Sequence, residues 1–224
     1  MKPRSLTVLL LLSCLAASAG EPYFCVREGA ELCYERTDAS SGRLRRTTTW
    51  RIDAVSAAGS GFRVDYTFTL RRPGGAPMYG GPSEMSVEVD TGGDVRMDLG
   101  ATMRAVFANM FPGADILSEG EPTLLPAGMQ PGDALPDAHS VVTVLGMKYR
   151  TTVTERRVLR RERITIPAGS FDCVVVREHK VERGPGRNRV TTADTWYAPG
   201  VGYVRHDTYD KNLRLETTEV LKKY

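Results

Sequence analysis

The stretch "FRVDYTFTL", from Phe62 to Leu70, alternates apolar and polar side chains without a break. Phe62, Val64, Tyr66, Phe68 and Leu70 share one parity, and a charged residue or a threonine fills every position between them. A repeat of two residues places all the apolar side chains on one side of a β-strand. The stretch therefore predicts a strand with one face buried and the other in water.

The same alternation recurs along the chain. It places Trp50 and Ile52 on one face in "TTTWRIDAV", and Met85 and Val87 on one face in "EMSVEVD". Turn-forming sequences such as "SAAGSG", "RPGG" and "TGGD" separate these runs. Further strands are expected at about 140–147, 149–155, 157–166, 171–183, 189–197, 203–209 and 213–221. Short strands joined by tight turns predict an antiparallel meander.

One segment has helical spacing instead. Over about 98–111 the apolar residues of "DLGATMRAVFANMF" recur every three or four positions, with Asp98 as the expected N-cap and Pro112-Gly113 as the stop. Its apolar face must be covered by the sheet. We predict a mostly β fold, a curved antiparallel sheet forming a half-barrel or open barrel, with one amphipathic helix packed on its concave face.

The segment from about 111 to 138 is rich in proline and glycine, which excludes long regular structure. Its leucine and methionine side chains need cover, so we predict an ordered loop with one short strand at "PTLLP".

The N-terminus has the pattern of a secretory signal: a basic tip, a short apolar run and the small residues Ala17-Ser18-Ala19. We predict a signal peptide at 1–19, a single antiparallel β domain at 20–224, and an exported protein of the periplasm or envelope, with no transmembrane segment after cleavage. A competing interpretation is a lipoprotein anchored through Cys14, although Leu12 fits that site poorly.

The net charge excludes few classes of function, and it suggests no nucleic-acid partner. Removal of Lys2 and Arg4 leaves 28 basic against 27 acidic residues, so the mature net charge is near +1. The basic runs "RLRR" (43–46) and "RRVLRRER" (156–163) stand in strand-like context, and we interpret them as solvated strand faces.

Three cysteines remain after the predicted cleavage, and an oxidising compartment permits one disulfide among them. We favour Cys25 with Cys173, because Cys33 occupies an ordinary strand position, although sequence alone does not fix the pairing. The three histidines, His139, His179 and His206, stand far apart in sequence. We predict no metal site and no cofactor.

The stretch "DTWYAPGVGYVR", from 194 to 205, predicts a turn between two strands. Pro199 and Gly200 have the order that a type II turn requires, and Gly202 suggests a bulge or a close backbone approach. Alternation places Trp196 and Tyr197 on opposite faces, with Trp196 expected in the core. Pro167 and Gly169 in "ITIPAGSFDC" are interpreted as structural turn residues of the same kind.

Several of these motifs occur together in one order: "VREGAELCYERTD", "PAGMQPGDALPDA", "ITIPAGSFDC", "TWYAPGVGYVR" and "YDKNLRLETTEVL". In this the chain resembles a TapB-like family of exported Bacteroidota proteins, and it is similar to bacterial envelope domains of unknown function that share the Trp-Tyr-x-x-Gly-Val-Gly ending. The resemblance covers nearly the whole mature chain. It implies an envelope location, a curved sheet with one helix, and pairing of Cys25 with Cys173, but no activity.

No motif of a nucleophile elbow, zinc protease, phosphate-binding loop or Cys-x-x-Cys pair occurs, so we predict that the protein is not an enzyme. The first functional hypothesis is binding of an apolar ligand, such as a lipid, between helix and sheet, because flexible methionines adapt to flexible ligands. Its residues would be Met85, Met103, Val106, Phe107 and Met110. The alternative is a structural or protein-interaction module of the envelope without a small-molecule ligand.

Overall fold

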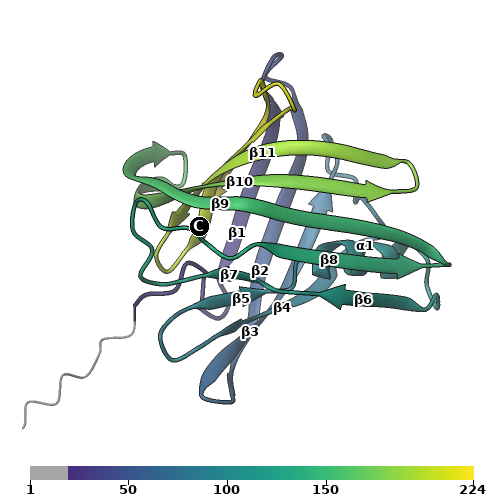
Figure 1. The fold of residues 1–224 in the computed structure, drawn as a ribbon, viewed down its shortest axis with the longest axis horizontal. Helices are drawn as coiled ribbons and strands as arrows, with labels where there is room; N and C mark the ends of the chain where they lie inside the picture. Colours follow the sequence, from purple (N-terminus) through teal and green to yellow (C-terminus); the bar gives the residue numbers. More distant parts are fainter. Residues whose placement is uncertain (1–19) are drawn as a thin grey trace, which may run out of the picture.

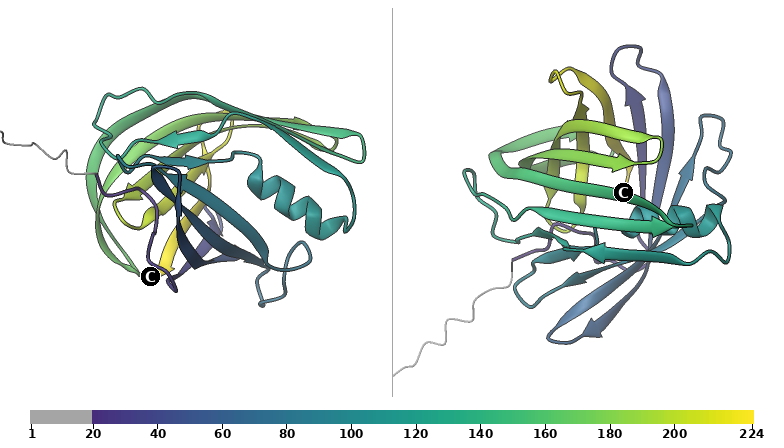
Figure 2. Two further views of the ribbon diagram at one scale, coloured as in Figure 1. Left: turned by 90° about the horizontal axis from the view of Figure 1, so that it is seen from below. Right: turned by 45° about the vertical axis from the view of Figure 1, so that its right-hand side comes forward.

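A computed structural model describes residues 20–224, and the predicted signal peptide and Cys14 lie outside this part of the chain. The described chain forms one antiparallel sheet of thirteen strands and a single helix (Figure 1). The sheet curves strongly around a concave face, as the views in Figure 2 show. The predicted mostly β class, with a curved sheet that does not close into a barrel, is confirmed. None of the described helical structure is long and apolar enough to cross a membrane.

The strands follow one another in the order β6-β8-β9-β10-β11-β12-β13-β1-β2-β3-β4-β5-β7. Their bounds are β1 Glu31–Asp38, β2 Leu44–Ala58, β3 Gly61–Arg71, β4 Ser83–Val89, β5 Val95–Met97, β6 Ile116–Gly120, β7 Thr123–Leu125, β8 Ala138–Val144, β9 Met147–Ile166, β10 Gly169–Gly184, β11 Arg187–Ala198, β12 Gly202–Tyr209 and β13 Leu215–Lys223.

The alternating stretch becomes β3, and its apolar parity is buried as predicted from Val64 to Leu70. Register carries the same face across the neighbouring strands, because Phe68 pairs with Trp50 of β2, and Tyr66 pairs with both Ile52 of β2 and Met85 of β4. The aromatic and aliphatic side chains of these strands therefore form one continuous inner surface of the curved sheet.

The two ends of the strand order lie close together. β6 is the last strand at one end and β7 the last at the other, yet only Glu121 and Pro122 separate them in sequence. After β7 the chain runs along β9, where Gly132 and Leu135 donate backbone N–H groups to the Val158 and Arg156 carbonyls. This loop holds the ends of the sheet together on one side.

Arg156 of β9 reinforces this junction from within. It is only 1% exposed, and its Nη1 donates to the carbonyl oxygens of Leu124 in β7, at 3.1 Å, and Pro136, at 2.9 Å. Its Nε lies 3.7 Å from Glu178 Oε2. A single charged side chain therefore joins β9 to the strand at the opposite end of the order.

Helix α1, Ala101–Met110, fills the remaining gap between the two ends of the sheet (Figure 2). It contacts β4 on one side and β6 and β8 on the other. Asn109 anchors it to the start of β4, with Nδ2 donating to the Pro82 carbonyl at 3.1 Å and to Ser83 Oγ at 2.9 Å. At the helix start a side chain at Gly100 would collide with Ser140 Oγ, so glycine is what permits the close approach to β8.

The local boundaries differ from the predicted ones. The helix begins at Ala101 because Asp98 accepts the Gly100 N–H within a preceding turn instead of capping the helix. The strands expected at 149–155 and 157–166 form one long β9, in which Glu155 has φ 53° where the register with β10 shifts. β7 confirms the short strand expected at "PTLLP", whereas β6 was not expected.

Both basic runs were wrongly interpreted as wholly solvated faces. In "RRVLRRER" the first residue, Arg156, is buried, and in "RLRR" the last residue, Arg46, lies among inner-face residues. Alternation places successive arginines on opposite faces, so part of each run necessarily points inward.

The predicted Cys25–Cys173 disulfide is not formed, since all three described cysteines are free thiols. Cys25 and Cys173 are both buried in the core, and the Cys173 thiol donates to the Phe171 carbonyl at 3.6 Å. Burial, with smaller effects of Asp172 and Glu162, raises the pKa of Cys173 to about 12, which keeps this thiol protonated and unreactive.

Substitution Arg156→Met is expected to lower the free energy of unfolding by about 2 to 4 kcal/mol, because it leaves two carbonyls without their charged donor. Arg157→Met is the matched control, since the neighbouring side chain is exposed. Urea unfolding of both variants measures the difference. Equal stability of the two variants would show that Arg156 does not hold the junction.

Candidate functional site

A cavity of about 160 Å³ lies on the inner face of the sheet under α1. β2, β3, β4, β12 and β13 supply its walls, and Thr102, an exposed residue of α1, borders it. Its lining residues are Arg46, Thr48, Trp50, Tyr66, Phe68, Leu70, Met85, Thr102, Tyr203 and Glu219. An aromatic and aliphatic wall thus faces a charged end.

The aromatic wall is a packed cluster that draws on distant parts of the chain. Tyr203 stacks on Tyr34 with ring centroids 4.4 Å apart, and the Trp50 ring lies 5.3 Å from both Tyr203 and Tyr66. The Tyr34 hydroxyl donates to the Tyr203 carbonyl at 3.1 Å. Burial raises the pKa of Tyr66 and of Tyr203, so both hydroxyls stay neutral at physiological pH. This wall offers a ligand flat apolar surface and no charge.

The charged end is built around Glu219, which is almost fully buried. Thr48 Oγ1 donates to Glu219 Oε1 at 3.1 Å, and Arg46 Nη2 lies 3.4 Å from Oε2. Arg36, beside Arg46 in the register of β1 and β2, approaches the same carboxylate at 3.7 Å and donates to Thr208 Oγ1 at 2.9 Å. Two guanidinium groups therefore share one carboxylate.

His206 lies next to this cluster, opposite Glu219 in the register of β12 and β13. Its Nδ1 is 2.8 Å from Thr195 Oγ1. Burial is the main cause that holds the pKa of His206 well below 6.5, and the positive charges of Arg36, Lys180 and Arg46 add to it. The imidazole is therefore neutral at physiological pH.

A larger groove of about 940 Å³ lies beside α1 and the strands β2 to β4, but its arginines are already paired. Arg51 bonds Asp53, Arg63 bonds Asp65 and Arg104 bonds Asp98, at 2.6 to 2.7 Å. Exposed pairs of this kind are held weakly and offer no concentrated charge to a ligand. The smaller cavity under α1 is therefore the candidate site.

Sequence comparison identifies the protein family. The profile of the family described as DUF3108-like matches residues 27–221, nearly the whole described domain. This chain belongs to the DUF3108-like family. The TapB-like name is not confirmed, and no curated protein matches the sequence.

Two solved structures share the fold of this DUF3108-like chain. One is a "putative exported protein with YmcC-like fold" from Bacteroides fragilis, 23% identical with a TM-score of 0.73. The other is a "putative lipoprotein" from Parabacteroides distasonis, 22% identical with the same TM-score. Each comparison covers 91% of this chain and 98% of the other. At this identity the likeness establishes a common fold.

The structure brings only part of the predicted ligand set together. Met85 lines the cavity, and Val106 packs against the core beside it. Phe107 instead stacks on Tyr149 of β9 at 4.8 Å, and Met110 is 46% exposed at the helix end. Met103 is half-buried on α1 and does not line the cavity. The helix contributes Thr102 to the site in place of its apolar stripe.

The turn residues from Ala198 to Gly202 do not line the cavity, although Tyr203 of the same motif does. Val201 donates its N–H to the Ala198 carbonyl at 3.2 Å around Pro199 and Gly200, and Gly200 has φ 70°, as a type II turn requires. Gly202 has φ 99°, and the register shift follows it, because Tyr197 pairs with Tyr203 and Trp196 with Arg205. Pro167 lies in the turn between β9 and β10, and Gly169 begins β10 with φ 137°.

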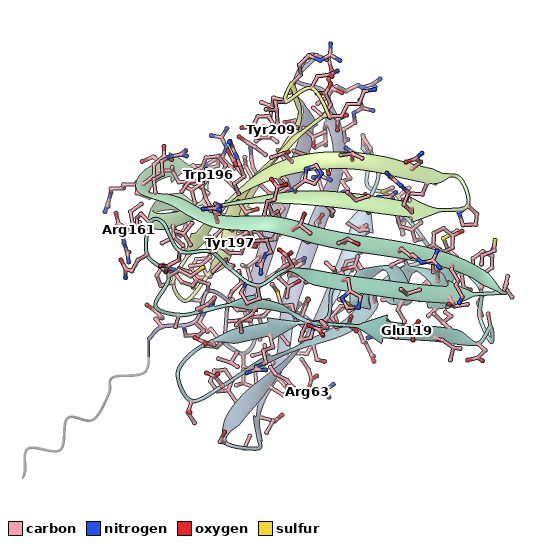
Figure 3. All side chains as sticks on the ribbon, viewed as in Figure 1. Arg63, Glu119, Arg161, Trp196, Tyr197 and Tyr209 are labelled. Atoms are coloured by element: carbon pink, nitrogen blue, oxygen red, sulfur yellow. The ribbon has the colours of Figure 1, made fainter. Side chains whose placement is uncertain are left out.

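Trp196 and Tyr197, labelled in Figure 3, occupy successive positions of β11. Trp196 is buried, but its cover is polar: the Arg205 and Arg160 guanidinium groups lie 4.8 and 5.7 Å from its ring, and its Nε1 donates to Glu162 at 2.9 Å. Tyr197 lies near the charges of Glu178 and Arg156. Trp196 thus joins β11 to β9 and β12 through cation–π contacts.

Sequence reasoning missed the charged end of the cavity. Arg46 was assigned to a solvated face and Glu219 was not singled out. Arg46 does share its parity with Thr48 and Trp50, so alternation alone carried a signal that this arginine lies on the apolar face. No local sequence pattern predicted that β1, β2 and β13 meet at Glu219.

The neutral state of His206 makes stability pH-dependent. Below about pH 6.5 the unfolded chain takes up a proton on His206 that the folded chain does not, so stability present above that pH is lost as pH falls. We expect the free energy of unfolding of the protein to fall between about pH 7 and pH 5.5, and His206→Gln to reduce that fall by up to about 1 kcal/mol. Urea titrations at both pH values test this, and an unchanged pH dependence in the variant would contradict it.

Proposed function

We propose that this protein is an exported, non-enzymatic protein of the cell envelope that binds an apolar ligand, such as a lipid, in the hollow of its curved sheet. The carrying observation is the cavity under α1, whose wall of Trp50, Tyr66, Phe68, Tyr203 and Met85 presents aromatic and thioether surface. Such lining is typical of small-molecule sites, in which a few polar groups fix the orientation of an apolar ligand.

The size of the cavity limits what it holds. A space of about 160 Å³ is close to the ~150 Å³ of an apolar cavity that binds benzene. The enclosed part of a ligand is then a ring or a few methylene groups, and the remainder of a longer chain extends beside α1. Thr102 is the point on the helix at which the ligand would pass.

Export is supported by the signal-like N-terminus and by the names of the two related structures, one described as exported and the other as a lipoprotein. The role as a binder, as opposed to a catalyst, is supported by the site chemistry. The cavity holds no nucleophile beside a base, and its one nearby histidine already bonds Thr195.

Binding can be followed with Trp50, because Trp196→Phe leaves it as the single tryptophan of the chain. We expect octanol or octanoate to shift the Trp50 emission to shorter wavelength, since either probe displaces water from the indole. Thr102→Phe, which fills the cavity from the helix, is expected to abolish the shift.

Ala108→Phe is the matched control, because Ala108 is an exposed residue of the same helix that lines the polar groove instead. The proposal fails if no eight-carbon probe changes the Trp50 emission, or if the two phenylalanine variants respond alike.

The intact mass of the protein purified from its native host tests its export. We expect a chain that begins at Gly20 without a lipid. A mass corresponding to an acylated N-terminus at Cys14 would establish the lipoprotein alternative, and an uncleaved chain would contradict export.

An interaction module without a small ligand remains the second candidate, favoured by one observation. β6 is the last strand of the order, and its residue Leu117 is 61% exposed, as is Leu145 in the neighbouring turn. An apolar edge strand can add a strand from another chain. Leu117→Lys would disrupt such a partner contact and leave the Trp50 response unchanged, which separates the two functions.

A further inference from the structure

The charged end of the cavity contains more positive than negative charge. Arg36 and Arg46 flank Glu219, which is the single carboxylate that either contacts within 4 Å in the described chain. The Glu219 oxygens also accept from Thr48, so the carboxylate is already shared three ways. One guanidinium charge therefore has no dedicated counterion.

Other acidic side chains near the same face are engaged elsewhere. Glu182 forms two hydrogen bonds with Arg187, at 2.8 and 2.9 Å, and Glu178 lies beside Arg156. Lys180, between them on β10, adds a further positive charge. Burial is the main cause that lowers the pKa of His206, and the positive charges of Arg36, Lys180 and Arg46 add to it.

The two arginines also have unused donor capacity. The Nε atoms of Arg36 and Arg46 are buried, and neither has a hydrogen-bond partner among residues 20–224. Buried N–H donors are almost always paired in folded proteins. The Arg46 side chain keeps 30% of its surface accessible and lines the cavity, so a ligand in the cavity can contact it.

We infer that the charged end binds the oxyanion of an amphiphilic ligand, a carboxylate or a phosphate, through Arg46, while Arg36, opposite Arg46 in the register of β1 and β2, adds positive charge. The apolar part of the same molecule then lies against Trp50 and Tyr203. This inference rests on the proposed function, because both parts of the ligand occupy one cavity. Guanidinium groups suit it, since their planar donors pair with carboxylate and phosphate oxygens.

The charged and the aromatic regions of the cavity lie along the same strand. Arg46, Thr48 and Trp50 alternate along β2 on the inner face, so the step from the charged to the aromatic region covers only four residues of one strand. Four residues of extended chain span about 13 Å. That length matches a head group followed by a short apolar chain.

The test compares probes that share an eight-carbon chain and differ in charge. In the Trp196→Phe background, Trp50 emission is titrated with octanoate, octyl phosphate, octanol and octylammonium. We expect at least one of the two anions to bind about tenfold or more tightly than octanol, and octylammonium to bind most weakly. Whichever anion binds more tightly identifies the head group.

Arg46→Gln is expected to lower the ratio of anion affinity to octanol affinity about tenfold. Arg51→Gln is the matched control, because Arg51 lies on the same strand but bonds Asp53 in the larger groove beside α1. Arg36→Gln provides a second variant if Arg46→Gln does not fold.

The outcomes separate the two proposals. Equal affinities for octanol and both anions, or an unchanged anion affinity in a folded Arg46→Gln variant, would overturn the oxyanion site and leave apolar binding intact. A Trp50 that responds to none of the four probes would overturn the proposed function as well.

Discussion

The hydrogen bonds of the buried Arg156 are the constraint on which the hollow of this protein depends. A sheet of thirteen strands has two ends, and its curvature alone does not hold them together. Arg156 on β9 bonds the carbonyls of Leu124 and Pro136, and so connects β7, at one end of the strand order, to β9 near the other end. A charge in this position is tolerated because each ion–dipole contact replaces water that the interior excludes. With α1 inserted between β4 and β8, part of the concave face becomes a cavity that stays partly open to solvent.

That space has two chemical halves because two kinds of strand meet in it. β2 and β3 bring the alternating aromatic residues, while Arg46 of β2 and Glu219 of β13 bring the charges, with Arg36 and His206 beside them in the register. Buried charges persist only where they are paired, and here Glu219 is shared by two arginines and a threonine. The same arrangement leaves the guanidinium side with surplus charge. Apolar surface and an anion-binding group are thereby placed a few residues apart in one cavity.

Local patterns predicted the elements better than the site. The alternation of Val64, Tyr66 and Phe68 gave β3 and its buried face, because the two-residue repeat of a strand is a property of the backbone itself. The helix was predicted from its spacing, but its start was misplaced, since Asp98 satisfies a turn before α1. Arg46 and Arg156 were predicted to face solvent because arginine is charged. Their positions in the alternating pattern nevertheless place them on the inner face of the sheet. The disulfide was predicted from the compartment and a family resemblance, and the buried thiols of Cys25 and Cys173 are free in the fold.

The sequence by itself determined most of the strands, the single helix and the turn at Pro199 and Gly200, because each depends on side chains within a few residues of one another. Only the tertiary structure decided that Arg46, Glu219 and Tyr203 meet in one cavity, because they come from β2, β13 and β12 and no local pattern relates them. It also decided that Thr102, and not the methionines of α1, faces that cavity, since the rotation of a helix against a sheet is fixed by packing at both of its sides. Contacts between residues more than a hundred positions apart are set by the strand register and the curvature of the sheet, which local sequence patterns do not reveal.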